Sequence, residues 1–224
     1  MPDGAIDAMA ARIAAMKPPR RLAVVHLSGA RGLDALASVA PNPRGSFHPL
    51  QSFPTPRPPS AFRGITVAVD ASAPALERRL GALARRLGAK PRHVGDAERL
   101  LYHAAAVFAS NFLDVVVGQG VELLRRLGWT EQEATEALLP LVDGAVDNIR
   151  HRGVVGALTG PIRRGDDKTV SSHLDVLGDP DLYRILGLVA LQMAREAGLD
   201  PEAVERTRRA LTRDVAATRR RGGE

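Results

Sequence analysis

The stretch Leu22-Ala23-Val24-Val25-His26-Leu27-Ser28-Gly29 decides the fold of the first part of the chain. Its nearly continuous apolar run, 22–27, is typical of a strand covered on both faces of a parallel sheet. An amphipathic pattern over residues 3–16 precedes the run, with Asp3 as the predicted N-cap. Pro18-Pro19 ends this helix, because proline cannot continue the helical hydrogen bonds. A helix, a short loop and a buried strand predict one unit of an α/β sheet.

The rest of the first 95 residues continues this alternation of strands and helices. Short strands are predicted at 46–48, 65–69 and 91–94, and helices at 33–39 and 75–87. The Pro-rich stretch 54–59 is a loop, because it has too few backbone donors for a strand. A sheet that begins at residue 22 leaves an edge unpaired, and we expect another segment or a partner subunit to cover it.

From Asp96 onward the apolar residues repeat with a helical period. Helices are predicted at 96–127, 130–151, 167–177, 180–198 and 201–220. Their start signals are the pair Thr130 and Glu133, and the dipeptides Asp179-Pro180 and Asp200-Pro201. We therefore predict an α/β fold followed by an all-α fold, with one domain at 1–95 and a second at 96–224.

The composition narrows the function classes. The chain is 45% apolar, carries 31 basic and 25 acidic residues and has a net charge of +6. No aromatic-basic pattern supports nucleic-acid binding, and no apolar run is judged long enough to cross a membrane. The absence of cysteine excludes thiolate metal sites and cysteine nucleophiles, and it suits a cytoplasmic protein. The six histidines lack the spacing of a metal site, so no metal is predicted.

Polar residues interrupt the apolar surface of the predicted helix 96–127. His103, Ser110, Asn111 and Asp114 lie at spacings that place them on one stripe, close to Tyr102. Such a stripe can line a cleft in which His103 acts as acid or base and Asn111 holds a carbonyl. The alternative is a set of hydrogen bonds between packed helices.

Two further segments carry candidate binding residues. Ser28-Gly29 and His48-Pro49 follow successive strands, at the sheet edge where open α/β sheets bind ligands. The segment 158–166 combines Thr159 with an arginine pair, Arg163-Arg164, that can clamp a carboxylate. The alternative for this segment is a turn with solvated arginines.

These segments together resemble a known family. The carrying stretches are Pro2-Asp3-x-x-Ile6, 25–30, Phe47-His48-Pro49-Leu50-Gln51-Ser52-Phe53, Leu101-Tyr102-His103-Ala104-Ala105 with Ala109-Ser110-Asn111, and Leu158-Thr159-Gly160-Pro161. They resemble bacterial Rossmann-like proteins whose C-terminal helical half is domain-of-unknown-function family 2520. The resemblance implies part of a Rossmann-like sheet, its second half only, followed by a helical bundle of the 6-phosphogluconate dehydrogenase C-terminal type that often forms a homodimer.

The resemblance also implies an activity and site residues. Relatives in this superfamily, such as the ketopantoate and prephenate enzymes, use NAD or NADP, so we expect an oxidoreductase that reduces a small carbonyl compound bearing a carboxylate. His103 and Asn111 would be catalytic, and Ser28 and Gly29 would bind the cofactor. The predicted substrate residues are His48, Gln51, Ser110, Thr159, Arg164 and Asp166.

The chain departs from this family at its cofactor loop. No Gly-x-Gly-x-x-Gly occurs, and Gly118-Gln119-Gly120 lies within a helical pattern. Since Met1 falls where relatives end their fourth strand, we expect either that the start codon lies further upstream or that the chain is naturally truncated. Dinucleotide binding by this chain is then expected to be weak. The alternative function is a non-catalytic dimerisation or small-ligand or protein-binding module.

Overall fold

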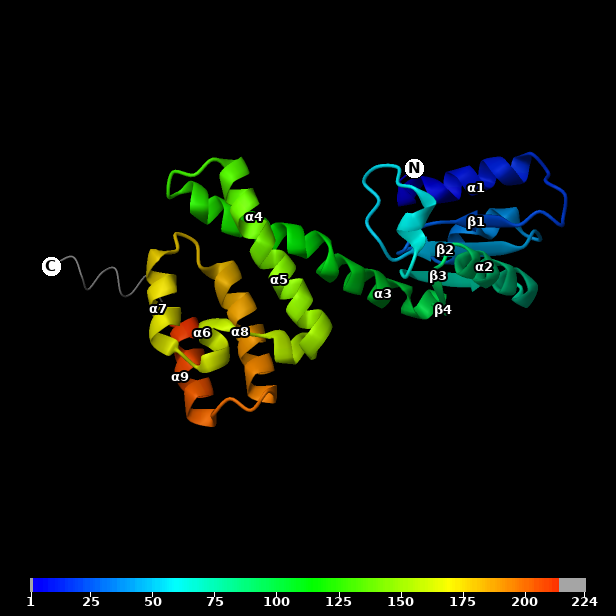
Figure 1. The fold of residues 1–224 in the computed structure, drawn as a ribbon. Coiled ribbons are helices and arrows are strands. Elements are labelled where there is room, and N and C mark those ends of the chain that lie inside the picture. The colour runs from blue at the N-terminus through cyan, green and yellow to red at the C-terminus, as the bar shows by residue number, and fades with distance from the viewer. Residues whose placement is uncertain (1, 214–224) are drawn as a thin grey trace. The chain divides into compact units, whose positions relative to one another are not determined.

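The computed structural model describes residues 2–213, which form two compact units divided between Gly120 and Val121 (Figure 1). The division falls within helix α4 (Asn111–Arg125). The predicted boundary after residue 95 coincides with the point beyond which the described residues form helices only. As a domain boundary it stays a prediction.

The first unit is built on a mixed four-stranded sheet. Its strands are β1 (Val24–His26), β2 (Arg44–Pro49), β3 (Thr66–Ala71) and β4 (Lys90–His93), in the order β1-β2-β3-β4. The β1–β2 and β3–β4 pairs are parallel, and the β2–β3 pair is antiparallel. The helical elements are η1 (Asp3–Ala5), α1 (Ile6–Ala15), η2 (Leu33–Val39), η3 (Pro59–Phe62), α2 (Pro74–Arg86), α3 (Asp96–Ala109) and most of α4.

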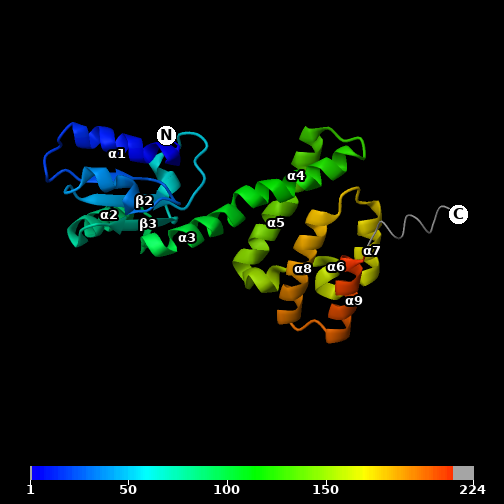
Figure 2. The same cartoon turned by 180° about the vertical axis from the view of Figure 1, so that it is seen from behind.

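Alternate residues along the strands face opposite layers of helix. Phe47, Val67 and Val69 pack with Leu76 and Leu80 of α2. On the other side of the strands, α1 packs on η2 in a cluster with members Ile6, Ala10, Ala35, Leu36 and Val39. Helices α1 and α2 lie on either side of the strands in both views (Figures 1 and 2). The predicted α/β architecture is therefore confirmed.

Strand β1 is the edge of the sheet, as predicted. It pairs with β2 alone, and it is not covered on both faces, because Val25 is 36% exposed and the flanking Leu27 is 63% exposed. The apolar run is typical of a strand in the centre of a sheet, but within residues 2–213 this strand lacks a neighbour on one side.

The long helix predicted at 96–127 is two helices. Ser110 adopts φ −123° and ψ −79°, which ends α3 after 14 residues, and α4 follows with 15 residues. Taken together, the two helices, Asp96–Arg125, are long and apolar enough to cross a membrane by length and composition alone, with a mean hydropathy of 1.6. The prediction that no run reaches this length is wrong by this measure. The break at Ser110 leaves each straight helix shorter than the roughly 20 residues of a spanning helix.

The second unit is helical within its described residues. Its helices are α5 (Glu131–Ala157), α6 (Gly160–Arg164), α7 (Asp167–Val176), α8 (Asp181–Glu196) and α9 (Pro201–Thr212). The core joins α7, α8 and α9 through Val170, Leu174, Leu191, Val204 and Leu211. Helix α6 was not predicted, because its residues were interpreted as a connection between two helices. The predicted extension of the last helix beyond residue 213 lies outside the described part.

Two of the four predicted start signals act as expected. Thr130 and Glu133 form the reciprocal capping box of α5, and Asp200 caps α9 by accepting from the Ala203 amide. Asp3 does not cap α1, whose N-cap is Ala5. The N-cap of α8 is Pro180, so the predicted role of Asp179 is also wrong, although its carboxylate still accepts from the next turn.

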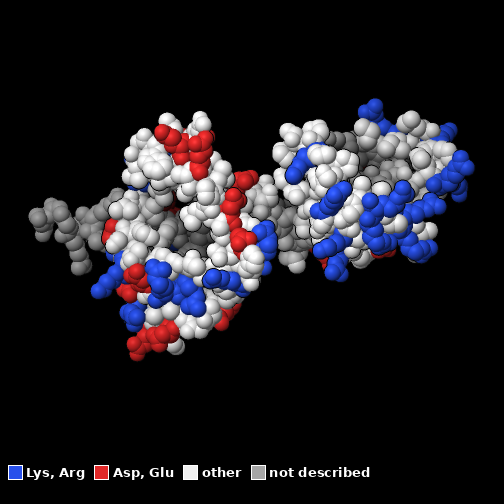
Figure 3. All heavy atoms as spheres, viewed as in Figure 1, with Lys and Arg blue, Asp and Glu red and all other residues white. Residues whose placement is uncertain are grey.

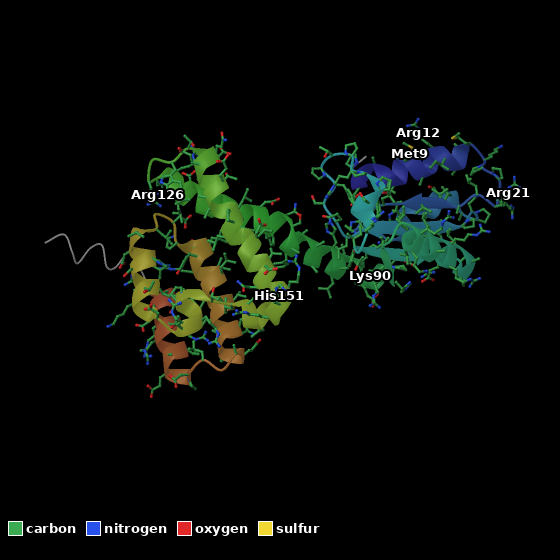
Figure 4. The ribbon with its side chains drawn as sticks, viewed as in Figure 1. Met9, Arg12, Arg21, Lys90, Arg126 and His151 are labelled. Carbon is green, nitrogen blue, oxygen red and sulfur yellow. The ribbon has the colours of Figure 1, made fainter. Side chains whose placement is uncertain are left out.

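Helix α2 and strand β4 together carry six basic residues, and blue side chains gather on this part of the first unit in Figure 3. The six are Arg78, Arg79, Arg85, Arg86, Lys90 and Arg92. Lys90 lies at the beginning of β4, and Arg12 projects from the outer side of α1 (Figure 4). Glu77 of α2 pairs with His93 at 2.9 Å.

Candidate functional site

A cavity of about 510 Å³ lies within the first unit. Its polar lining comes from two segments that are far apart in sequence. The end of β2 and the loop after it contribute His48, Gln51 and Ser52, and α3 with the beginning of α4 contributes Tyr102, His103, Ser110 and Asn111. Alanines of α3 form much of the remaining wall. The structure thus brings together five of the predicted site residues: His48, Gln51, His103, Ser110 and Asn111.

His48 is held by Tyr102. Its Nδ1 lies 2.9 Å from the Tyr102 hydroxyl oxygen, and the two rings meet edge to face with centroids 5.6 Å apart. Burial lowers the pKa of His48, and the neighbouring His103 and Arg99 lower it further. Burial raises the pKa of Tyr102. Both groups are therefore favoured in their neutral forms at neutral pH.

Gly29 brings the two histidine rings together. A Cβ atom at this position would lie 2.7 Å from His48 Nε2 and 2.9 Å from His103 Cδ2. Only a residue without a side chain allows both rings to approach the end of β1 this closely. Gly29 is thus placed where the sequence predicted a ligand-binding residue, at the carboxyl end of a strand.

Ser28 turns away from this contact. Its hydroxyl donates to Asp3 and accepts from the backbone amides of Ala30 and Arg31. The side chain is 6% exposed, and its hydrogen-bonding capacity is used within the chain. Only the backbone of Ser28 is then available to contact a cofactor. Its cofactor-binding role stays a prediction.

Arg99 of α3 is buried close to these residues, although it does not line the cavity. It is 1% exposed, and its guanidinium donates to the Ser46 hydroxyl at 2.9 Å and to the Val94 carbonyl at 2.8 Å. A longer bond of 3.5 Å reaches the Ser28 carbonyl. Because these acceptors follow or belong to three strands, Arg99 ties the beginning of α3 to the carboxyl ends of β1 and β4 and to the middle of β2.

Two more titratable groups lie near this guanidinium. His26 Nε2 donates to the Gly32 carbonyl oxygen at 3.1 Å, and burial, followed by Arg99, lowers the pKa of His26. Asp70 is opposite Ser46 in the β2–β3 register, and burial raises its pKa. The buried charge of Arg99 thus favours neutral histidines on this face of the sheet.

Three predicted residues of the cavity have few partners of their own. The Gln51 side chain accepts from the Ser52 amide, and no hydrogen bond is formed by the side chains of Ser110 or Asn111 to other residues of the range 2–213. Asp114, the fourth residue of the predicted polar stripe, is not part of the lining. The break at Ser110 explains this difference, because the stripe was projected on one straight helix.

The remaining predicted substrate residues belong to the second unit. Thr159 is the N-cap residue of α6, Arg164 lies in the last turn of that helix, and Asp166 caps α7. The Asp166 carboxylate accepts from the hydroxyl and amide of Thr169, and these bonds lower its pKa. Asp166 therefore stabilises a helix start, and its predicted substrate role is untested, as are those of Thr159 and Arg164.

Sequence reasoning missed Arg99 and did not assign Tyr102 to the site. Arg99 precedes Tyr102 and His103 by three and four residues and so lies on the same face of α3. That spacing was visible, but an arginine on an amphipathic helix is most often solvated. Among residues 2–213 there is no group of three His, Asp or Glu side chains placed to hold a metal ion.

Comparisons with known proteins agree with this architecture. A structure described as "putative NADP oxidoreductase BF3122" from Bacteroides fragilis is 26% identical, with a TM-score of 0.73, over 86% of this chain and 73% of that chain. Protein TM1727 from Thermotoga maritima is 24% identical, with a TM-score of 0.72, over 88% and 77%. Pyrroline carboxylate reductase from Plasmodium falciparum, solved with NADP bound, shares 9% identity at a TM-score of 0.52, over 94% and 79%.

These likenesses confirm the predicted Rossmann-like fold class followed by a helical part. No curated protein sequence matches the chain. The model of one protein family, described as "Domain of unknown function (DUF2520)", matches residues 65–193, which is more than half of the chain. The chain belongs to this family, DUF2520, as its sequence motifs suggested.

Proposed function

We propose that the protein is an NAD(P)-dependent oxidoreductase that reduces a small carbonyl compound bearing a carboxylate. The observation that carries the proposal is the cavity of the first unit, where His48 and His103 meet over Gly29 beside the unengaged side chains of Ser110 and Asn111. It lies at the carboxyl ends of strands, where α/β sheets bind ligands. The likeness to the Bacteroides fragilis structure described as a "putative NADP oxidoreductase" supports the reaction class.

In this proposal four cavity residues have one role each. His103 donates the proton to the carbonyl oxygen, and Asn111 orients that oxygen by a hydrogen bond. Gln51 and Ser110 contact the body of the substrate. The substrate roles of Thr159, Arg164 and Asp166 stay separate predictions, because these residues belong to the second unit.

The residues present fit only one end of the cofactor. Gly29 has no side chain, so its backbone can approach a flat nicotinamide ring, which supplies the hydride when bound. The 224 residues contain no Gly-x-Gly-x-x-Gly turn for the pyrophosphate. We therefore propose that this chain binds NADPH and NADH weakly, which calorimetry measures directly. Tight binding of either dinucleotide would contradict this part of the proposal.

The reaction is tested by oxidation of NADPH with a panel of small 2-oxo acids and their amides, and NADPH is supplied at high concentration because its proposed binding is weak. We expect turnover of at least one acid and poor turnover of its amide, because the amide lacks the carboxylate. His103→Gln should lower kcat by about 10²–10⁴, the usual contribution of a general acid. His151→Gln, at an exposed position on α5, is the matched control. Equal rates in the wild type and H103Q would contradict the role of His103.

The second candidate function is a non-catalytic module that forms a homodimer or binds another protein. The observation that favours it is the exposed apolar surface of α8, where Ile185 is 61% and Val189 is 56% exposed. Homodimerisation is compatible with the enzyme proposal as well. Absence of both dinucleotide binding and turnover, together with specific protein binding, would favour the module alone.

A further inference from the structure

The cavity contains a hydrogen bond that the proposed roles do not use. Tyr102 and His48 are 54 residues apart in sequence, yet the Tyr102 hydroxyl lies 2.9 Å from His48 Nδ1. Among residues 2–213, this is the hydroxyl's one hydrogen-bond partner. A pair of half-buried groups held edge to face in a cavity wall calls for an explanation beyond packing.

The direction of this hydrogen bond follows from the chemistry of the two groups. A phenol is a good donor, and a neutral imidazole has one nitrogen that accepts and one that donates. If Nδ1 carried the proton, the Tyr102 hydroxyl hydrogen would have no acceptor among the described residues. If Tyr102 donates to Nδ1, the hydrogen bond is made and the ring proton lies on Nε2. The network therefore favours the Nε2–H tautomer.

The Nε2 atom of His48 is available to a ligand. It has no hydrogen-bond partner in the described part of the chain, and it is not among the buried unpartnered atoms of that part. Gly29 and His103 are its neighbours, and His48 lines the cavity. A polar N–H at this position can donate to an oxygen placed between the two histidine rings.

We propose that His48 is a neutral hydrogen-bond donor to the carbonyl oxygen of the bound substrate, and that Tyr102 is the positioning residue that sets its tautomer. The inference rests on the proposed function, because it names the group that binds the reacting oxygen while His103 supplies the proton. Two adjacent histidines then have different roles, as expected where the surroundings favour the neutral form of one of them.

The charges around His48 agree with a neutral donor. Arg99 and His103 from α3 and His26 from β1 each disfavour a positive charge on its ring, and Asp3 favours one. Burial is the largest cause, and it lowers the pKa of His48 in the same direction as these three side chains do. A neutral imidazole donates a hydrogen bond without repelling a protonated His103, so both rings can contact one oxygen.

The chain supplies a matched control for this pair. In the second unit, His173 Nδ1 lies 2.8 Å from the Tyr183 hydroxyl, and the rings are edge to face with centroids 5.7 Å apart. This geometry is nearly that of His48 and Tyr102. Tyr183→Phe therefore removes an equivalent hydrogen bond from a residue to which no ligand role is given.

The test uses ¹⁵N-histidine-labelled full-length protein and NMR of the ring nitrogens. We expect His48 to be the Nε2–H tautomer in the wild type and in Y183F, and a mixture of tautomers in Y102F. Titration with a 2-oxo acid should shift the His48 Nε2 resonance, and Y102F should weaken this binding about 3- to 10-fold, the effect of one neutral hydrogen bond. His48→Gln, which retains an amide donor, should bind more tightly than His48→Ala.

Several outcomes would overturn the inference. An Nδ1–H tautomer in the wild type, or an unchanged tautomer in Y102F, would exclude the role of Tyr102 whether or not the protein is active. An Nε2 resonance that no carbonyl compound of the panel shifts would exclude His48 as the donor. Failure of the proposed reductase function has a different result: ligand-induced shifts at His48 without any oxidation of NADPH. Folding of each variant is checked by circular dichroism.

Discussion

Gly29 is the residue on which the candidate site depends most directly. The methyl group of an alanine would come within 2.7 Å of His48 Nε2 and 2.9 Å of His103 Cδ2, which is closer than carbon atoms approach in folded proteins. Both contacts are with side chains, so the rings can move away. The physical effect of a substitution here is therefore displacement of the site more than loss of the fold.

The first prediction follows from this contact. Gly29→Ala should move both histidine rings and weaken binding of a 2-oxo acid at least 10-fold, while the free energy of unfolding falls by about 1–3 kcal/mol, as for other overpacked positions. Gly4→Ala, which meets nothing within 4 Å, is the control. NMR titration measures binding and urea denaturation measures stability. Wild-type affinity in G29A would contradict the close approach.

The second prediction concerns His26 and pH. Burial and then Arg99 lower the pKa of His26 in the folded protein. Between the ordinary histidine pKa of about 6.5 and the lower folded value, the unfolded chain binds a proton that the folded chain does not. The free energy of unfolding should therefore decrease as pH falls below about 6.5, and be independent of this group above about 7.5.

Substitution isolates this contribution. In His26→Gln the loss of stability between pH 7 and pH 5 should be smaller than in the wild type, although His48, whose pKa is also lowered, still contributes. His151→Gln, exposed on α5, should keep the wild-type dependence. Urea denaturation across this pH range makes the comparison. An identical dependence in the wild type and H26Q would show that His26 takes up its proton equally in both states.

At the scale of elements, the connection between α6 and α7 depends on a glycine that differs from others in the second unit. Gly165 ends α6 in the left-handed conformation, with φ +67° and ψ +29°. A Cβ here would lie 2.7 Å from Ala203 Cβ of α9. Gly198 has a similar φ of +85°, but nothing lies within 4 Å of its Cβ position. Alanine at Gly198 would therefore introduce backbone strain alone, whereas alanine at Gly165 would introduce both strain and a steric clash.

The third prediction compares alanine at these two positions. Gly198→Ala should lower the free energy of unfolding by about 1–2 kcal/mol, the strain of a left-handed alanine. Gly165→Ala should lower it by a further 1–3 kcal/mol, roughly, because α9 must also shift. Urea denaturation monitored by helical circular dichroism measures both. Equal losses would mean that α9 moves away from Gly165 without cost.

The break between α3 and α4 shows how an element serves the site. A straight helix would separate His103 from Asn111 by eight residues along one axis. The non-helical backbone of Ser110 changes the helix direction, and Ser110 and Asn111 line the same cavity as His103. Sequence periodicity predicted that these residues share a face, but it does not detect a break that one residue's φ and ψ produce.

At the scale of the whole molecule, both units expose apolar surface. Val25 and Leu27 at the sheet edge and Phe108 of α3 are exposed in the first unit, and Ile185 and Val189 of α8 are exposed in the second. At roughly 25 cal/mol per Å², burial of a few hundred Å² amounts to several kcal/mol. Such surfaces mark sites of association in soluble proteins.

The fourth prediction is a homodimer that uses α8. Sedimentation of the wild type should show a dimer, and the double variant I185E/V189E should be largely monomeric, because two carboxylates cannot be buried without partners. Gln192→Glu, at another exposed position on α8, should remain dimeric. A monodisperse wild-type monomer would contradict the prediction. A dimer that persists in the double variant would place the interface elsewhere.

The strands, nearly all of the helices and the family could be predicted from the residues alone. The helical period, the Thr130 capping box and the apolar run before Ser28 are local sequence patterns, so they can be recognised without knowing which elements pack together. The position of Gly29 at the end of a strand was predictable for the same reason. Helix α6 and the N-cap of α1 were not, because their alternatives differ by little in local energy.

The assembly of the site could not be predicted in this way, because it depends on how separate elements pack together. Arg99 is buried because α3 packs on the sheet so that its guanidinium meets acceptors from three strands. The contact between Tyr102 and His48 joins residues 54 positions apart, and it depends on the sheet register and on the position of α3 against it. Sequence patterns record which residues share a face of one element, whereas contacts between elements depend on how those faces pack.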